Sequence, residues 1–401
     1  MPRPTSHHAI VIVGGGTAGI TVAARLRRAG QHDVAVIDPA VDHYYQPLWT
    51  LVGAGCAKLD ATRRRQADVM PRGVTWIRQA AVQIDPEAQE VVLADGGTVG
   101  YESLVVCPGI QLDWGQIGGL AESLGRDGVS SNYRPDLAPR TWDLIRDMRE
   151  GTAVFGMPSG PIKCAGAPQK IAYLAADHWR RQGVLDRIHV VLVLPTPKLF
   201  GVPVFNAELE RVVDRYGIDV RLTSEVTEVD PDGREVVVTA LGDGGTKERL
   251  HYDIAHLVPP QSAPDWVKSS PLSTGDAKGY VAVDKGTMQH LRWPNVFALG
   301  DAGSTPNSKT GAAVRKQAPV VVANLLAQRA GRPLPASYDG YASCPITTAR
   351  GKMLLAEFDY TLEPRPTFPL IDTTHERRDM WLLKKYGLPF MYWNLMLKGR
   401  A

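Results

Sequence analysis

The sequence AIVIVGGGTAGITVAARLRRAGQHDVAVID, residues 9–38, decides the fold. Residues 9–13 read as an apolar strand, residues 20–28 as a helix, and residues 33–37 as a second strand. Gly14, Gly16 and Gly19 have G-x-G-x-x-G spacing, and Asp38 ends the second strand. This order is that of a Rossmann βαβ unit. It predicts a dinucleotide whose pyrophosphate lies at the helix N-terminus and whose ribose hydroxyls are bound by Asp38.

A second region of the chain repeats this layout. Residues 151–281 contain apparent strands at 152–155 and 188–194 and helices at 167–181 and 206–216. The first unit resumes later, where a strand at 295–299 ends in Gly300-Asp301. We therefore expect an α/β fold with two Rossmann-like dinucleotide-binding domains. The expected boundaries are 1–120 with 282–345 for the first domain, 151–281 for the second, and 346–401 for a C-terminal segment.

The second unit lacks the glycine turn of the first. Its corresponding stretch is GMPSGPIKCAGAP, residues 156–168, and Pro195-Thr196 stands where a ribose-binding acid would follow the next strand. A nicotinamide cofactor would find neither a phosphate cradle nor a ribose acceptor here. Because Cys164 lies in this loop, we predict an electron donor that a thiol can capture. The alternative is that Cys164 is only a small apolar residue.

Composition excludes several classes of protein. The 45 basic and 42 acidic residues nearly balance, at a net charge of +3, which argues against a nucleic-acid-binding protein. The four cysteines have no metal-like spacing, so we expect neither a disulfide scaffold nor a metal site. The first residues match no export or transit signal, and no run of about 18 apolar residues occurs. These features favour the reducing cytoplasm of a prokaryote.

Several motifs together resemble the sulfide:quinone oxidoreductases, most closely the mitochondrial-type (type II) branch. The resemblance extends over residues 9–399 and is carried by HYYQPLWTLVGAG at 43–55, GIQLD at 109–113, PIKCAGAPQKI at 161–171, WPNVFALGD at 293–301, SKT at 308–310, YDGYASCP at 338–345 and LAEFDY at 355–360. It implies the fold of the FAD/NAD-linked disulfide reductases. It also implies an enzyme that oxidises hydrogen sulfide to sulfane sulfur and passes two electrons through FAD to a membrane quinone.

The resemblance assigns roles to particular residues. Cys164 and Cys344 would be the redox pair beside the flavin, although they lie 180 residues apart (344 minus 164). Lys163 is the neighbouring cation that could lower a cysteine pKa. Cys56 and Cys107 match no redox position, so FAD should be bound non-covalently. The expected FAD contacts are Gly14, Gly16, Gly19, Asp38, Gln46, Pro47, Gly109, Gly300, Asp301 and Lys309.

The C-terminal residues 379–398 alternate Trp, Tyr, Leu and Met with lysines. This composition is typical of short amphipathic segments at a membrane surface, and the alternative is a helix docked on the protein's own core. Candidate quinone contacts are Phe358, Tyr360 and Phe390. We expect a peripheral, monotopic protein on the cytoplasmic face of a prokaryotic cell membrane. Further candidate partners are a small thiol or sulfite as sulfur acceptor and a second copy of the chain.

Three other functions remain open from the sequence. A type II NADH:quinone oxidoreductase shares the expected fold but needs the second nucleotide site. A flavocytochrome-type sulfide dehydrogenase uses a similar cysteine pair with a haem subunit outside the cytoplasm. A sulfide sensor or persulfide carrier would bind flavin without enzymatic turnover.

Overall fold

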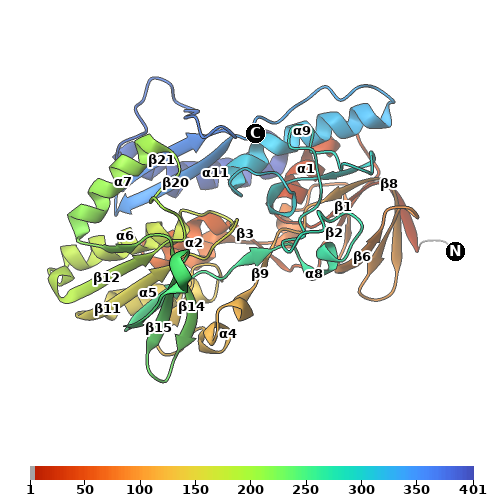
Figure 1. Ribbon diagram of the computed structural model, residues 1–401. Coiled ribbons are helices and arrows are strands. Elements are labelled where there is room, and N and C mark those ends of the chain that lie inside the picture. The colour runs from red at the N-terminus through yellow and green to blue at the C-terminus, as the bar shows by residue number, and fades with distance from the viewer. Residues whose placement is uncertain (1–4) are drawn as a thin grey trace.

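The computed structural model describes residues 5–401, and its first sheet is built around the N-terminal strand (Figure 1). Seven strands have the order β5-β2-β1-β8-β7-β6, with β19 also paired to β8. β1 pairs in parallel with β2 and β8, whereas β6 and β7 form an antiparallel hairpin. Their bounds are β1 (Ser6–Val13), β2 (Val34–Ile37), β5 (Thr75–Ile77), β6 (Ala81–Asp85), β7 (Glu90–Leu93), β8 (Thr98–Val106) and β19 (Val296–Ala298). Helices α1 (Thr17–Arg28) and α9 (Gly311–Arg329) pack against each other on this sheet.

The second sheet contains five parallel strands in the order β10-β17-β11-β12-β13. Its central strands are mostly apolar and mostly buried, as expected for parallel strands covered on both faces. The strands are β10 (Val129–Ser130), β11 (Gly151–Gly156), β12 (Ile188–Val193), β13 (Asp219–Arg221) and β17 (Ile254–Leu257), and the neighbouring helices are α5 (Leu137–Asp147), α6 (Ala167–Arg181) and α7 (Pro203–Tyr216).

The chain also forms smaller sheets and short helices outside the two main sheets. A three-stranded antiparallel sheet is formed by β14 (Ser224–Asp230), β15 (Glu235–Ala240) and β16 (Lys247–His251). The two-stranded pairs are β3 (Asp42–Tyr44) with β4 (Arg63–Arg65), and β9 (Gln111–Leu112) with β18 (Gln261–Ser262). The short helices are α2 (Trp49–Gly53), α3 (Gln66–Val69), α4 (Leu120–Ser123) and α8 (Asp265–Lys268).

The C-terminal part forms a hairpin followed by a helical tail. Strands β20 (Ala342–Ala349) and β21 (Lys352–Phe358) pair antiparallel, and β20 packs on α6 (Figure 1). The tail comprises α10 (Arg378–Leu382), a π-helical turn η7 (Leu383–Gly387), α11 (Leu388–Asn394) and the 3₁₀ turn η8 (Met396–Lys398). It returns to the first domain, where the Tyr392 hydroxyl lies 2.9 Å from Thr17 Oγ1 and 2.6 Å from His43 Nε2. Within residues 5–401, we find no helix with the length and apolar character needed to cross a bilayer.

The elements agree closely with the sequence periodicity, with two differences at the domain boundaries. Helix α6 has the expected bounds, Ala167–Arg181. Strand β10 lies before residue 151 and yet pairs with β17 in the second sheet, and β20 continues past residue 345. Both differences arise from long-range strand pairing, which local composition does not encode.

Candidate functional site

The first glycine turn connects β1 to α1. Gly14 has φ +102°, and a Cβ there would lie 2.4 Å from the carbonyl oxygen of Cys107. A Cβ on Gly19 would lie 1.8 Å from the Gly14 carbonyl oxygen, so both positions require glycine. By contrast, a Cβ on Gly16 would meet nothing within 4 Å, and α1 begins without a side-chain cap or an acidic residue. The turn thus offers open space at the positive end of a helix, which fits a pyrophosphate.

Asp38 follows β2 and is tied to this turn. Its carboxylate accepts hydrogen bonds from the Gly15 N–H at 2.5 Å and the Ala40 N–H at 2.7 Å. Gln66 supports the turn as well, because its Nε2 donates to the Gly15 carbonyl oxygen at 2.7 Å. A carboxylate has about four acceptor sites, so Asp38 keeps capacity for ribose hydroxyls.

The second turn connects β11 to α6 and holds Cys164 in a left-handed conformation, φ +52°. This region is uncommon for residues other than glycine and persists where surrounding contacts over-determine it. Here the Cys164 N–H donates to the Lys309 carbonyl at 3.0 Å, and the Lys163 N–H donates to Gln261 Oε1 at 2.8 Å. The Tyr133 hydroxyl donates to the Lys163 carbonyl at 2.7 Å. The turn is therefore fixed from three other segments of the chain.

The structure brings Cys164 and Cys344 together across the fold. Cys344 lies in β20 and is 2% exposed, whereas Cys164 is partly exposed. A Cβ on Gly166 would lie 2.7 Å from Cys344 Sγ, so glycine at this position allows β20 to approach the start of α6. Both cysteines are free, and they lie close enough for each to shift the pKa of the other. This arrangement can interconvert between two thiols and a disulfide.

Two buried lysines determine the electrostatics of the pair. Lys170 is 1% exposed, and its Nζ donates to Cys164 Sγ at 3.2 Å. Lys384, from the tail, is 3% exposed and donates to the Pro47 carbonyl at 3.3 Å. The hydrogen bond from Cys344 and the charges of Lys170 and Lys384 hold the pKa of Cys164 well below its usual range, although burial opposes this.

The groups around Cys164 also have shifted pKa values. Donation to Cys164, together with burial, raises the pKa of Cys344 well above its usual range. The thiolate also raises the pKa of Lys170 despite its burial. Burial and the charge of Lys170 lower the pKa of Lys384 to about 7. Cys164 is therefore the more acidic sulfur of the pair, and Lys170 is the cation in contact with it.

The cation at Cys164 is thus Lys170 rather than its sequence neighbour Lys163. Lys163 Nζ points away and donates to Gln46 Oε1 at 2.7 Å. Lys170, by contrast, lies in the first turns of α6, within hydrogen-bond distance of the cysteine. Lys170, Lys384 and Tyr133 were not anticipated. A lysine six positions beyond the cysteine, at the start of the following helix, was the only local signal for Lys170.

Lys309, Asp301 and Gly109 are further residues expected to contact the flavin. Lys309 Nζ donates to the Gly303 carbonyl at 2.9 Å and lies 4.0 Å from the centre of the Tyr280 ring. Burial lowers the pKa of Lys309 to about 8, while Asp301 opposes this; burial raises the pKa of Asp301, against the charge of Lys309. Gly109 has φ +81° and open space where its Cβ would be.

Two buried polar atoms beside these residues have no partner. In the described part of the chain, neither the Tyr280 hydroxyl nor Gln261 Nε2 makes a hydrogen bond. Unpaired buried polar groups are costly and call for an explanation, which a polar ring system in this space would supply. The open cradle at Gly16 and these two atoms together fit a dinucleotide with a flavin ring.

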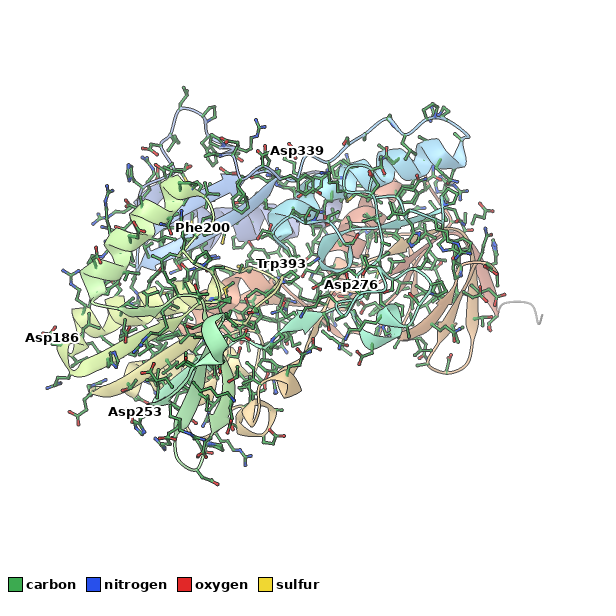
Figure 2. All side chains as sticks on the ribbon, in the orientation of Figure 1. Asp186, Phe200, Asp253, Asp276, Asp339 and Trp393 are labelled. Atoms are coloured by element: carbon green, nitrogen blue, oxygen red, sulfur yellow. The ribbon has the colours of Figure 1, made fainter. Side chains whose placement is uncertain are left out.

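The three quinone candidates lie in different surroundings. Phe358 is buried at the end of β21, with its ring 5.7 Å from that of Phe200, which Figure 2 shows beside the hairpin. The Tyr360 hydroxyl donates to the Lys285 carbonyl at 2.9 Å. Phe390 is 63% exposed on α11. The structure does not gather these three side chains into one site.

The other two cysteines are apart from Cys164 and Cys344. Cys107 is buried after β8, where its Sγ lies 3.6 Å from the Gly14 carbonyl oxygen, and burial raises its pKa. Cys56 Sγ lies 3.4 Å from Arg350 Nε. Neither position is tied to Cys164 or Cys344 by a hydrogen bond among residues 5–401.

Comparison with known proteins places this geometry in a family. Residues 8–318 match the family model described as pyridine nucleotide-disulphide oxidoreductase. The chain is 39% identical to a mouse protein named mitochondrial sulfide:quinone oxidoreductase, over 98% of this chain and 87% of that one. It is 40% identical to a protein of the same name from Dictyostelium discoideum, over 98% and 86% of the two chains.

A solved structure shows the same architecture. The sulfide:quinone oxidoreductase of Aquifex aeolicus superposes with a TM-score of 0.80 at 19% identity, over 99% of this chain and 92% of that one. At this identity the likeness concerns the fold alone. It confirms the expected α/β fold of the disulfide-reductase type.

One expectation from the sequence is wrong. We expected a protein on the cytoplasmic face of a prokaryotic cell membrane, but relatives from mouse, Dictyostelium discoideum and Schizosaccharomyces pombe, at 38–40% identity, are mitochondrial proteins of eukaryotes. That expectation rested on the first residues of the chain. A missing signal pattern there carries no information about the compartment.

Proposed function

Because the chain belongs to the pyridine nucleotide-disulphide oxidoreductases and, within them, to the sulfide:quinone oxidoreductases, we propose that Cys164 and Cys344 are the groups through which it oxidises sulfide. The enzyme is an FAD-dependent oxidoreductase whose substrates are sulfide and a quinone. The observation that carries the proposal is the contact between Lys170 Nζ and Cys164 Sγ, at 3.2 Å, beside the Cys344 thiol. It contributes to the difference in acidity between the two sulfurs.

The difference in acidity sets the direction of attack. In the oxidised pair, hydrosulfide attacks one sulfur of the disulfide, and the other sulfur leaves as a thiolate. The sulfur with the lower pKa leaves faster. Cys164 is that sulfur, because Cys344 and Lys170 stabilise its negative charge. Attack therefore occurs at Cys344, which becomes the persulfide, and Cys164 becomes the thiolate.

The persulfide must then be unloaded. A nucleophile such as a small thiol or sulfite attacks the outer sulfur of Cys344 and carries it away as sulfane sulfur, which leaves Cys344 reduced. Reforming the disulfide from the two reduced cysteines releases two electrons and closes the cycle. FAD, when bound, accepts this electron pair and passes it to the quinone.

The chain's own residues would hold FAD without a covalent bond. Gly14, Gly16 and Gly19 form the cradle for the pyrophosphate, and Asp38 is positioned for the ribose. Around the ring we assign Gln46, Pro47, Gly109, Gly300, Asp301 and Lys309. A lysine near the ring would stabilise negative charge on reduced flavin, and the burial of Lys309 makes its charge more effective. Cys56 and Cys107 remain free of the cofactor.

An anaerobic titration of the purified, FAD-loaded protein tests the proposal. Sulfide together with sulfite as the sulfur acceptor, about one equivalent of each per flavin, should bleach the flavin absorbance. A short-chain quinone should then restore it, and denaturation with acid should release the flavin into the supernatant. NADH is the matched control donor, and it should leave the flavin oxidised because the second turn holds Cys164 in place of a phosphate cradle. Bleaching by NADH but not by sulfide would overturn the proposal.

A further inference from the structure

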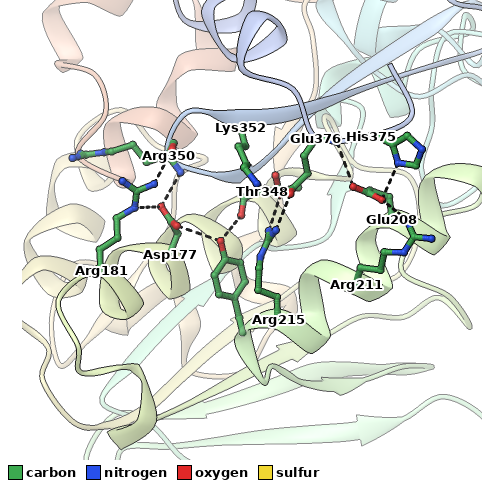
Figure 3. Close-up of polar contacts among 11 residues, drawn as sticks. Asp177, Arg181, Glu208, Arg211, Arg215, Thr348, Arg350, Lys352, His375 and Glu376 are labelled. Carbon is green, nitrogen blue, oxygen red and sulfur yellow. Dashed lines mark hydrogen bonds and ion pairs between the residues drawn. The ribbon is translucent and has the colours of Figure 1, made fainter. Parts of the chain in front are cut away.

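A strongly basic cavity lies at the far end of α6 from the cysteine pair. Its volume is about 240 Å³, and it is formed where the C-terminal ends of α6 and α7 meet the β20–β21 turn and the start of α10 (Figure 3). Six basic side chains line it: Arg180, Arg181, Arg215, Arg350, Lys352 and Arg378. Helix α6 has 15 residues, or about 22 Å at 1.5 Å per residue, so the cavity is remote from the thiols at its start.

The acidic residues at the cavity do not balance this charge. Asp177 pairs with Arg181 at 2.8 Å, and Glu376 forms two hydrogen bonds of 2.7 Å with Arg215 (Figure 3). Six basic residues minus these two acids leave an excess of +4. Arg180 and Arg378 make no ion pair or side-chain hydrogen bond with any part of the chain that the structure describes. A site with two uncommitted guanidinium groups suits a phosphate, which accepts the paired N–H donors of arginine.

The tail extends an apolar surface from this cavity. Arg378 begins a helical segment that continues without interruption through η7 to Asn394. Leu382, Tyr386 and Phe390 follow at four-residue intervals and are 55%, 60% and 63% exposed. A regular α-helix has 3.6 residues per turn, so a four-residue spacing drifts around its axis. The wider π-helical turn in the middle offsets this drift, and the three side chains stay on one outward face.

We propose that the cavity binds the phosphate of an anionic phospholipid, while Leu382, Tyr386 and Phe390 enter the interface next to it. A soluble anion would need only the basic residues. An apolar stripe that starts at a cavity arginine matches a ligand with a charged headgroup and an acyl chain. The inference rests on the proposed reduction of a membrane quinone, because that reaction requires the protein to stay at a bilayer. It assigns the cavity the task of fixing the protein's orientation there.

Flotation with lipid vesicles tests this inference on the FAD-loaded, full-length protein. Vesicles of phosphatidylcholine, alone or with a fraction of phosphatidylglycerol, are compared. We expect the double variant Arg180→Gln/Arg378→Gln to bind anionic vesicles roughly 25-fold more weakly, about fivefold for each charge removed from the surface. Its binding to neutral vesicles should stay unchanged. The matched control is Arg72→Gln/Arg332→Gln, which removes two exposed arginines from the first domain and should bind almost as the wild type does.

Three further results decide between the sources of the phosphate. Leu382→Ser/Tyr386→Ser should weaken binding to both kinds of vesicle, and unchanged binding would overturn the lipid assignment. If the cavity variant and its control lose binding to anionic vesicles equally, the effect comes from net charge alone, and the proposed site is wrong. In a third outcome, inorganic phosphate raises the melting temperature of the wild type but not of the cavity variant, and both proteins bind vesicles equally. This result would mean that the cavity binds a soluble anion and not a lipid. Sulfide should reduce the flavin in the arginine variants as in the wild type, so a failure of the proposed function would appear separately.

Discussion

The two βα turns occupy equivalent places in two sheets of the same kind, yet they handle negative charge in opposite ways. The turn after β1 removes side chains, so that the N–H groups of α1 can meet an anion brought by a ligand. The turn after β11 places Cys164 in a left-handed conformation and surrounds it with Lys170 and Lys384. It therefore generates its own anion, a thiolate. Under the proposed function, one backbone path thus serves cofactor binding in the first domain and redox chemistry in the second.

The largest expected effect comes from filling the first turn. In Gly19→Ala, the new Cβ would lie 1.8 Å from the Gly14 carbonyl oxygen, so the backbone must move. We expect a loss of stability of about 1–3 kcal/mol and the loss of flavin. Melting temperature and flavin content of the purified protein measure both effects. A stable variant with full flavin content would show that the turn is not the phosphate cradle.

Gly16→Ala sharpens this test because it separates folding from cofactor binding. A Cβ at Gly16 meets no protein atom within 4 Å, so the flavin-free variant should melt at the temperature of the flavin-free wild type. It should nevertheless retain little FAD, since the methyl group takes the space for the pyrophosphate. Gly115→Ala, at another open position outside the turn, is the control and should keep its flavin.

In the second turn, Lys170→Met should weaken the thiolate. Removal of the cation 3.2 Å from Cys164 Sγ raises the pKa of that thiol. Each pH unit of this rise lowers the thiolate fraction roughly tenfold at any pH below the new pKa. The alkylation rate of the reduced protein by iodoacetamide, measured against pH, reports this shift. Lys163→Met is the comparison, and an equal shift there would contradict the assignment of Lys170.

A smaller, pH-dependent effect is expected from Lys384. Its pKa of about 7 means that it loses its charge as the pH rises through 7. The Cys164 thiolate is then less stabilised and more nucleophilic, so alkylation should accelerate roughly two- to threefold across this range. In Lys384→Met the step should disappear.

Lys384 also has a defined effect on stability. Between pH 7 and its ordinary pKa of 10.5, the unfolded state holds the proton that the folded state has released. The unfolded state binds more protons there, so stability rises with pH over this window. Denaturant titrations of Lys384→Met should show a shallower pH dependence, and an unchanged slope would mean that Lys384 stays charged when folded.

The smallest effect should come from the two cysteines outside the pair. Cys56→Ser and Cys107→Ser should leave flavin reduction by sulfide unchanged, because neither sulfur is near Cys164 or Cys344. Cys107→Ser should lower the melting temperature slightly, since it buries a hydroxyl beside the Gly14 carbonyl. Loss of reduction in Cys56→Ser would mean that a third sulfur takes part.

The sequence predicted those features that are local. The glycine spacing at 14–19, the acid at 38 and the bounds of α6 all follow from short-range pattern and turn chemistry. The pairing of Cys164 with Cys344 came from resemblance, because no local signal joins residues 180 positions apart (344 minus 164). Lys384 was not predicted for the same reason: it reaches the cysteines from the tail, through packing that only the assembled fold creates.

Side-chain direction limited the prediction as well. Lys163 is the sequence neighbour of Cys164, but its side chain contacts Gln46, while a helical position six residues later supplies the cation. The tail was expected either at an interface or on the core. In the structure one side of the tail packs on the protein, where Tyr392 is hydrogen-bonded to Thr17. The other side is exposed and carries Leu382, Tyr386 and Phe390.

The most direct test of the account is a comparison of Cys164→Ser and Cys344→Ser in an anaerobic sulfide titration of the FAD-loaded proteins. Each variant lacks one sulfur of the disulfide, so hydrosulfide has no bond to break and no thiolate to displace. We predict that neither flavin is bleached by excess sulfide, although both proteins bind FAD and reoxidise normally after chemical reduction. Full reduction of the flavin by sulfide in either single variant would contradict the two-cysteine mechanism.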